Sequence, residues 1–354
     1  MKKLLGLFIS VCLLGSCTKD TPQIKLVVLM VADQLRPDLL SRFDDLYKGG
    51  FRWLIDNGVS FTNVHHEHSY TATGPGHYVI GTGQYPGPGG VLGNSFYDRV
   101  LKKQVNCVED PVAKPIGGVG SARSYVRYSI KGIGDWMKSA DSLSKVYSIA
   151  GKGRSAVFLG GKHPDLVLYY NYHDSFISSD YYVESAPSWL NAFNQALNMQ
   201  IYRDSLWTRS FPDSVYIKYA REDHFVGEVD SYRDDPYSPV FPIGFDPDVE
   251  PGDEIMGMPW FENLILNLAG SVLIEESLGQ DHHVDLLSIS FSAMDWIIHY
   301  FGPFSQEVMD ASIKLDEYLG DFISDLDRSI GLEHIEFILT ADHGGLPLPE
   351  YERS

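Results

Sequence analysis

Cysteine and basic residues are scarce in this chain of 354 residues. Of its three cysteines, two lie within the first 17 residues, which leaves Cys107 alone in the rest of the chain. One cysteine cannot form an intrachain disulfide, so stability must come from packing or from bound metal. The 28 basic residues face 47 acidic ones, a net charge of −19. This balance argues against nucleic acid as a partner, because it would repel a phosphate polymer. An anionic substrate must therefore be bound by a local group of positively charged side chains.

Internal repeats and low-complexity tracts are also absent, and the apolar run Leu4–Leu14 is too short to span a bilayer as a permanent helix. Preceded by two lysines, this run is typical of a secretion signal. It ends in Leu14-Gly15-Ser16-Cys17, which resembles a bacterial lipobox, in which Cys17 would be acylated and become the new N-terminus. The lipobox implies a periplasmic or surface lipoprotein whose only membrane contact is the lipid anchor. Thr18 favours the outer membrane by resemblance to sorting patterns. The alternative is an ordinary cleaved signal peptide.

The remaining sequence predicts an α/β fold with a mostly parallel central sheet flanked by helices and an inserted cap lobe. Apolar, strand-like runs alternate with amphipathic segments, and 44% of the residues are apolar, enough to fill an interior. Apolar residues recur at helical spacing over Val308–Ile330, which predicts a crossover helix. The predicted organisation is a signal peptide (1–16), a polar tether (17–23), the catalytic core in two parts (24–171 and 258–354) and the cap lobe between them (172–257).

Three of the strand-like runs deliver an aspartate at or just beyond their ends. Ile24–Ala32 leads into Asp33, Val284–Phe291 leads towards Asp295, and Ile335–Ala341 leads into Asp342. His299 follows Asp295 by four residues, and His343 follows Asp342 directly. Ligands collect at the carboxyl ends of parallel strands, and carboxylate with imidazole is a donor set that binds Zn²⁺. The pattern predicts a metal-dependent hydrolase.

A hydroxyl group lies in the Gly/Pro-rich turn Thr71–His77, ahead of an apolar stretch. If Thr73 begins a helix, the free N–H groups there favour an anion beside it. The alternative is a simple N-cap, for which threonine is common.

Five segments together carry a resemblance to a known family: Asp33-Gln34-Leu35-Arg36, Thr73-Gly74-Pro75-Gly76-His77, Gly93-Asn94, Ser290-Phe291-Ser292-Ala293-Met294-Asp295 with His299, and Thr340-Ala341-Asp342-His343-Gly344. In order and spacing they resemble the alkaline phosphatase superfamily, in its type I phosphodiesterase/nucleotide pyrophosphatase branch. Within that branch the segments are most similar to the threonine-nucleophile bacterial alkaline phosphatases. The resemblance runs from about Leu26 to the end of the chain.

The resemblance implies two zinc ions and a phosphothreonine intermediate. Thr73 corresponds to the nucleophile, and Asp33, Asp342 and His343 correspond to ligands of the zinc that activates its hydroxyl. Asp295 and His299 correspond to ligands of a second zinc about 4 Å away. Without the resemblance, the alternative interpretation of Asp295 and His299 is an exposed i,i+4 contact on a helix.

Two further parts of the site follow from the same correspondence. Asn94 matches an amide that donates to a phosphoryl oxygen; read alone, it is a turn residue. Lys152-Gly153-Arg154 resembles the Lys-x-Arg pair of the threonine-type phosphatases, where two cations favour a phosphate monoester, nearly a dianion at pH 7, over a diester. The alternative for this pair is a solvated basic loop. The expected partners are small phosphate esters.

The clustered residues His65-His66-Glu67-His68 are not expected to form the catalytic zinc site, and His77 is expected to support a ligand or pack. A sulfatase is disfavoured, since formylglycine is made from cysteine or serine and the nucleophile position holds Thr73.

The resemblance also predicts that part of the family pattern is missing. The second zinc would take another histidine from far downstream, whereas only eleven residues follow His343. We expect a partial sequence of a longer protein, or else a genuine truncation. The competing functions are a phosphodiesterase or nucleotide pyrophosphatase, and an inactive, truncated metal-binding lipoprotein.

Overall fold

The computed structural model describes residues 23–228 and 240–351. The predicted signal peptide and Cys17 lie outside the described residues, so both stay predictions. No helix in the described ranges is long and apolar enough to cross a membrane.

A seven-stranded sheet forms the centre of the described chain, in the order β4-β7-β6-β5-β8-β1-β9. Parallel pairing joins β6 (Leu166–Tyr170), β5 (Val146–Ala150), β8 (Asp285–Phe291), β1 (Leu26–Ala32) and β9 (Ile335–Thr340). Two antiparallel strands, β7 (Phe176–Ser179) and β4 (Pro115–Ile116), extend one side. Every residue of β5, β6 and β8 is buried, as expected for strands that helices cover on both faces. The predicted mostly parallel sheet is confirmed.

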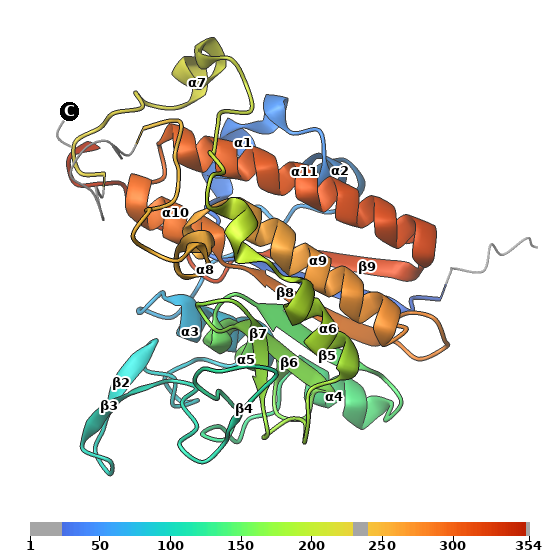
Figure 1. The fold of residues 1–354 in the computed structure, drawn as a ribbon. Coiled ribbons are helices and arrows are strands. Elements are labelled where there is room, and N and C mark those ends of the chain that lie inside the picture. Colours follow the sequence, from blue (N-terminus) through green and yellow to red (C-terminus); the bar gives the residue numbers. More distant parts are fainter. Residues whose placement is uncertain (1–22, 229–239, 352–354) are drawn as a thin grey trace, which may run out of the picture.

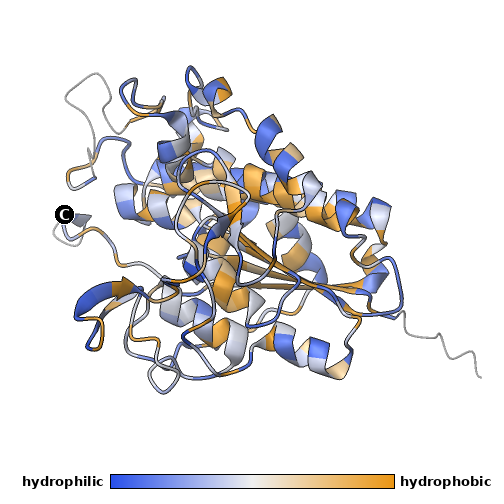
Figure 2. Cartoon of the chain, turned by 60° about the horizontal axis from the view of Figure 1, so that its bottom comes forward, coloured by the Kyte–Doolittle hydropathy of each residue, from blue (hydrophilic) through white to orange (hydrophobic). Residues whose placement is uncertain are grey.

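Helices cover both faces of this sheet (Figure 1). The long helices α9 (Trp260–Glu275) and α11 (Gln306–Ser329) lie over one face, with α2 (Gly50–Asn57) and α10 (Ala293–Phe301). The other face carries α3 (Thr73–Thr82), α4 (Ile133–Ala140) and α5 (Gly153–Gly160). Hydrophobic strands fill the interior, and hydrophilic residues gather on the outer faces of the helices (Figure 2). The helix predicted over Val308–Ile330 is α11, where Ser305 Oγ caps the N-terminus by accepting from the N–H of Val308.

The remaining elements are short. They are α1 (Pro37–Arg42), α6 (Ser188–Ala196), α7 (Asp213–Tyr219), α8 (Pro251–Glu254), the 3₁₀ turns η1 (Asp44–Leu46), η2 (Met199–Tyr202), η3 (Ile255–Gly257) and η4 (Leu332–His334), and a separate hairpin of β2 (Ser95–Asp98) with β3 (Lys103–Asn106). The range 172–257, expected as a cap lobe, contains β7, which pairs with β6 in the central sheet, and then α6 to α8. A cap role for this range stays a prediction.

One helix end is held by a carboxylate from a distant part of the chain. Asp316 on α11 is buried and accepts from the N–H groups of Lys48, Gly49, Phe51 and Arg52 around the start of α2. The first N–H groups of a helix have no partner within it, and a negative charge beside them is favourable. Asp316 therefore fixes α2 against α11.

Two buried carboxyl groups lie where α11 faces the segment before residue 229. Glu307 and Glu228 are buried, and Arg221 pairs with Glu228. Within residues 23–228 and 240–351, neither carboxyl oxygen of Glu307 has a hydrogen-bond partner. Burial raises the pKa of Glu228 to about 7, against the opposing charge of Arg221 and with a smaller contribution from Asp223. Burial, and then the charge of Glu228, raise the pKa of Glu307 well above its usual range. These carboxyl groups hold protons in the folded state that they release when the chain unfolds.

We therefore expect the free energy of unfolding to fall with rising pH. Both folded-state pKa values lie above the unfolded value near 4.5, so the contribution is complete below that value. The part due to Glu228 is lost as pH rises through 7, and the part due to Glu307 is lost as pH rises through its own raised pKa. Between pH 5 and pH 8 the loss should be roughly 1–3 kcal/mol. Urea titrations at both pH values measure it. Glu307→Gln should flatten this dependence, whereas Glu317→Gln, an exposed position on the same helix, should not. Equal slopes in the two variants would contradict the assignment.

Candidate active site

The three predicted aspartates meet at one edge of the sheet. Asp33 follows β1, Asp342 lies two residues beyond the end of β9, and Asp295 lies in the first turn of α10 after β8. The strands β8, β1 and β9 are neighbours and parallel, so their carboxyl ends lie side by side. Asp33 and Asp342 are fully buried, and Asp295 is 6% exposed.

Three of the predicted ligands come close enough to share one ion. Asp33, Asp295 and His343 each offer a ligand atom, and these atoms lie within 4.8 Å of one another. His343 Nε2 is 3.2 Å from Asp33 Oδ1 and 3.7 Å from an oxygen of each other aspartate. Burial alone would lower the pKa of His343, but its hydrogen bond to Asp33 and the charge of Asp342 raise it to about 9. Imidazole beside carboxylates is a donor set suited to Zn²⁺.

The hydrogen bonding of this group fits a bound cation. Asp33 Oδ1 and Asp295 Oδ1 are buried, and the partners that the described residues offer them are imidazole nitrogens, His343 Nε2 at 3.2 Å and His299 Nε2 at 3.3 Å. A divalent cation between a buried carboxylate oxygen and an imidazole nitrogen would be bound by both and would offset the cost of burying the carboxylate. The residues present therefore fit a divalent metal ion.

Lys152 supplies positive charge to the same two carboxylates. It follows β5, is 1% exposed, and its Nζ lies 2.6 Å from Asp33 Oδ2 and also contacts Asp295 Oδ2. Burial opposes the charged ammonium, yet the charges of Asp33 and Asp295 raise the pKa of Lys152. The alternative of a solvated basic loop is wrong for this residue because its side chain is buried. The structure places Lys152 on predicted metal ligands, and its contact with substrate stays a prediction.

Arg154 and Asn94 meet the start of α3. Thr73 is the first residue of α3, and its Oγ1 accepts from Arg154 Nη2 at 3.3 Å. The N-cap position is Ala72, which makes no side-chain cap, so Thr73 is not the simple N-cap of the alternative interpretation. Asn94 Oδ1 instead accepts from the N–H of Gly74 at 2.7 Å. The structure thus brings three predicted site residues together at one helix end.

A glycine allows α3 to approach Asp342. A Cβ added at Gly76 would lie 2.2 Å from the carbonyl oxygen of Asp342, so any side chain there would force the helix away from β9. His77, one residue on, contacts the Thr73 carbonyl oxygen at 2.9 Å and Asp342 Oδ2 at 3.0 Å through Nδ1, and Ser290 Oγ at 2.9 Å through Nε2. The charges of His77 and His343 hold the pKa of Asp342 well below its usual range, although burial opposes this. His77 supports Asp342, as expected.

His299 lies at the margin of the site. It stands one turn after Asp295 on α10, its Nε2 is 3.3 Å from Asp295 Oδ1, and its side chain is 62% exposed. The two residues therefore share one face of α10, and binding of a second metal by the pair stays a prediction. The residues of His65-His66-Glu67-His68 do not belong to the group of ligand atoms around Asp33; His66 Nε2 contacts the carbonyl oxygen of Ala341 at 3.2 Å.

Sequence reasoning missed one buried residue behind the site, Glu262 on α9. Its carboxylate accepts from the backbone at the start of α10. The signal lay in helical spacing, because Glu262 falls on the same face as the apolar residues Ile265, Leu266 and Ala269.

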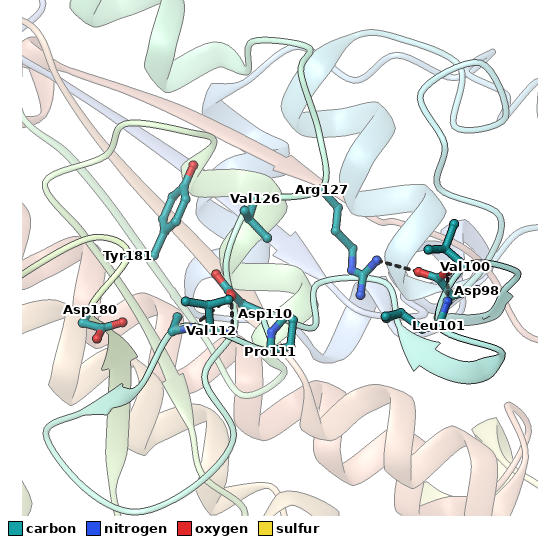
Figure 3. Close-up of a pocket in the computed structure, with 11 residues that line it drawn as sticks. Asp98, Val100, Leu101, Asp110, Pro111, Val112, Val126, Arg127, Asp180 and Tyr181 are labelled. Atoms are coloured by element: carbon teal, nitrogen blue, oxygen red, sulfur yellow. Dashed lines mark hydrogen bonds and ion pairs between the residues drawn. The ribbon is translucent and has the colours of Figure 1, made fainter.

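A separate pocket of about 750 Å³ lies beside the β2–β3 hairpin and shares no lining residue with this site (Figure 3). Its walls include Val112 and Val126, and Arg127 pairs with Asp98 at its edge.

The model of the type I phosphodiesterase / nucleotide pyrophosphatase family matches residues 27–354. The chain belongs to this family. It is 34% identical to alkaline phosphatase PhoV of Synechococcus elongatus over 93% of this chain and 60% of that protein. It is 31% identical to alkaline phosphatase PafA of Elizabethkingia meningoseptica over 97% of this chain and 64% of that protein.

Among solved structures of this superfamily, that of wild-type alkaline phosphatase PafA superposes with a TM-score of 0.87 at 30% identity, over 94% of this chain and 65% of that one. The predicted α/β fold with a mostly parallel central sheet and the predicted family are therefore confirmed. The chain spans less than two thirds of the length of these relatives.

Removal of the Lys152 charge should destabilise the protein without metal. Lys152→Met leaves Asp33 and Asp295 buried without their cation, and we expect unfolding in chelator to become easier by roughly 3–5 kcal/mol. Added Zn²⁺ should recover much of this loss. Urea unfolding with and without metal measures both effects, with Lys131→Met, at an exposed lysine, as the control. Equal losses in the two variants would contradict this charge balance.

Proposed function

We propose that this chain carries the catalytic centre of a phosphate monoester hydrolase, an alkaline phosphatase that acts through a phosphothreonine at Thr73. The observation that carries the proposal is the contact of Arg154 with the Thr73 hydroxyl, at the N-terminus of α3, beside the Asp33, Asp295 and His343 group. His77 links this hydroxyl to the candidate metal ligands, because it contacts both the Thr73 carbonyl oxygen and Asp342. The similarity to PhoV and PafA supports the same activity.

Two Zn²⁺ ions are the proposed cofactors. Asp33, Asp342 and His343 would hold the first, and Asp295 with His299 would hold the second. When bound, zinc lowers the pKa of a coordinated hydroxyl and stabilises a leaving oxygen.

The chain's own residues would orient the ester. The Arg154 guanidinium can bind two phosphoryl oxygens at once, and the NH₂ group of Asn94 can donate to a third, because its oxygen is engaged by Gly74. The Thr73 oxygen would displace the alcohol from phosphorus, and water would then hydrolyse the phosphothreonine to release phosphate. His77 holds the carbonyl of Thr73 and the carboxylate of Asp342 in one arrangement.

The proposed substrates are small phosphate monoesters. Lys152 and Arg154 would supply the positive charge that attracts these anions to a chain whose net charge is −19. A phosphodiesterase is the alternative, favoured by the family model that matches the chain. We also propose that the protein is exported and anchored through Cys17 as a periplasmic or surface lipoprotein, with the outer membrane as its expected location.

Thr73→Ala should lower turnover of a chromogenic phosphate monoester at least about a thousand-fold in zinc buffer, because the nucleophile is lost. Thr71→Ala, an exposed position in the same turn, should keep full activity. Acid quenching followed by mass spectrometry should find phosphate on Thr73 in the unaltered chain. Equal turnover in both variants would overturn the proposal. Bound zinc without any turnover would favour the non-enzymatic alternative.

The paired change Lys152→Ala with Arg154→Ala should cut monoester turnover roughly 100-fold more than diester turnover, since the monoester carries more negative charge. Steady-state kcat/KM for both ester classes measures this difference, and Arg99→Ala, at an exposed arginine, is the control. Equal losses for the two classes would point to the diesterase.

A further inference from the structure

The first turn of α10 is buried and has no cap of its own. Ser292, Ala293, Met294 and Asp295 are each at most 6% exposed, so water cannot readily satisfy the free N–H groups at this helix end. Ser292 occupies the N-cap position, but its side chain makes no cap, and its buried hydroxyl has no hydrogen-bond partner in the part of the chain that the structure describes. The acceptors for this turn must come from elsewhere in the fold.

Glu262 on α9 provides them. Its Oε1 accepts from the N–H of Ala293 at 2.6 Å and of Met294 at 3.3 Å, and its Oε2 accepts from Ser292 at 3.2 Å. Glu262 is 2% exposed, and the bonds span about thirty residues of sequence. A carboxylate that accepts backbone N–H groups at a helix N-terminus gains from both hydrogen bonding and the helix dipole.

This turn carries a predicted ligand. Asp295 follows the three bonded N–H groups directly, and its carboxylate contacts Lys152 and lies 3.7 Å from His343 Nε2. Hydrogen bonds at three consecutive amides restrict rotation and translation of the helix start, so the direction of the Asp295 side chain is fixed with it. Loss of the Glu262 carboxylate would leave these buried N–H groups unpaired, and the turn would have to move to find other acceptors.

We propose that Glu262 is a positioning residue that holds the first turn of α10 and thereby aims Asp295 into the metal site. Its role in metal binding rests on the proposed function, whereas its role in ordering α10 does not. The residue acts through the backbone N–H groups at the start of α10.

The test compares Glu262→Gln with Glu275→Gln, an exposed glutamate on the same helix. Glutamine keeps one acceptor oxygen and presents an NH₂ group where the second oxygen accepted. Hydrogen exchange in chelator measures the order of α10 without metal. We expect the amides of residues 292–299 to exchange at least about tenfold faster in Glu262→Gln and unchanged in Glu275→Gln. Unchanged exchange in Glu262→Gln would overturn the proposal, whatever the metal results.

Zinc affinity, measured by competition with a chromogenic chelator, tests whether Glu262 contributes to metal binding. Loss of an outer partner of a metal ligand typically weakens binding about 10–100-fold, which is the expected effect of Glu262→Gln. Measurement at pH 9 keeps the carboxylate ionised, because burial raises the pKa of Glu262 to about 8.

A double-mutant cycle distinguishes an effect of Glu262 on the position of Asp295 from a general loss of order around the site. If Glu262 acts through Asp295, then Glu262→Gln added to Asp295→Asn should weaken zinc binding no further than Asp295→Asn alone. Full additivity would overturn the link to Asp295. Faster exchange of α10 in Glu262→Gln, combined with no zinc binding by the unaltered chain, would leave the positioning role standing while the proposed metal function fails.

Discussion

Neutralisation of buried negative charge at the carboxyl edge of the sheet is the constraint on which this structure depends. Asp33, Asp295 and Asp342 lie together with almost no exposure to water. The described chain balances them with Lys152 on the first two and with His77 and His343 around the third. Uncompensated carboxylates at this depth would be strongly destabilising. The same balance makes the edge a place where a divalent ion can be bound.

The order of the strands brings this balance about. Neighbouring parallel strands β5, β8, β1 and β9 end respectively before Lys152, Asp295, Asp33 and Asp342. Each charged residue therefore comes from a different part of the chain, separated by up to some three hundred positions, yet all reach one edge. Short connections after the strands leave little freedom, so the positions of the side chains follow from those of the strands.

Buried helix ends supply the second layer of order. Asp316 holds the start of α2, and Glu262 holds the start of α10, each from a helix distant in sequence. At α3 the carboxamide of Asn94 has the same function and bonds Gly74 beside Thr73. Acceptors from outside the helix allow its N-terminus to be buried against the sheet, where an N-terminus capped only by water could not lie. The reactive groups gain rigid support in this way.

Local patterns along the chain were enough to predict the parallel sheet, the long helix α11 and the family, because apolar periodicity and the spacing of short motifs are local properties. It also indicated Asp33, Asp295 and His343, since polar residues at strand ends meet whenever the strands are parallel neighbours. Three contacts could be known only from the folded chain: Lys152 lies on two of the carboxylates, Asn94 rather than Thr73 bonds the start of α3, and Glu262 holds α10. Those contacts join residues far apart in the chain, and their partners are chosen by burial and by the order of the strands, which no local pattern encodes.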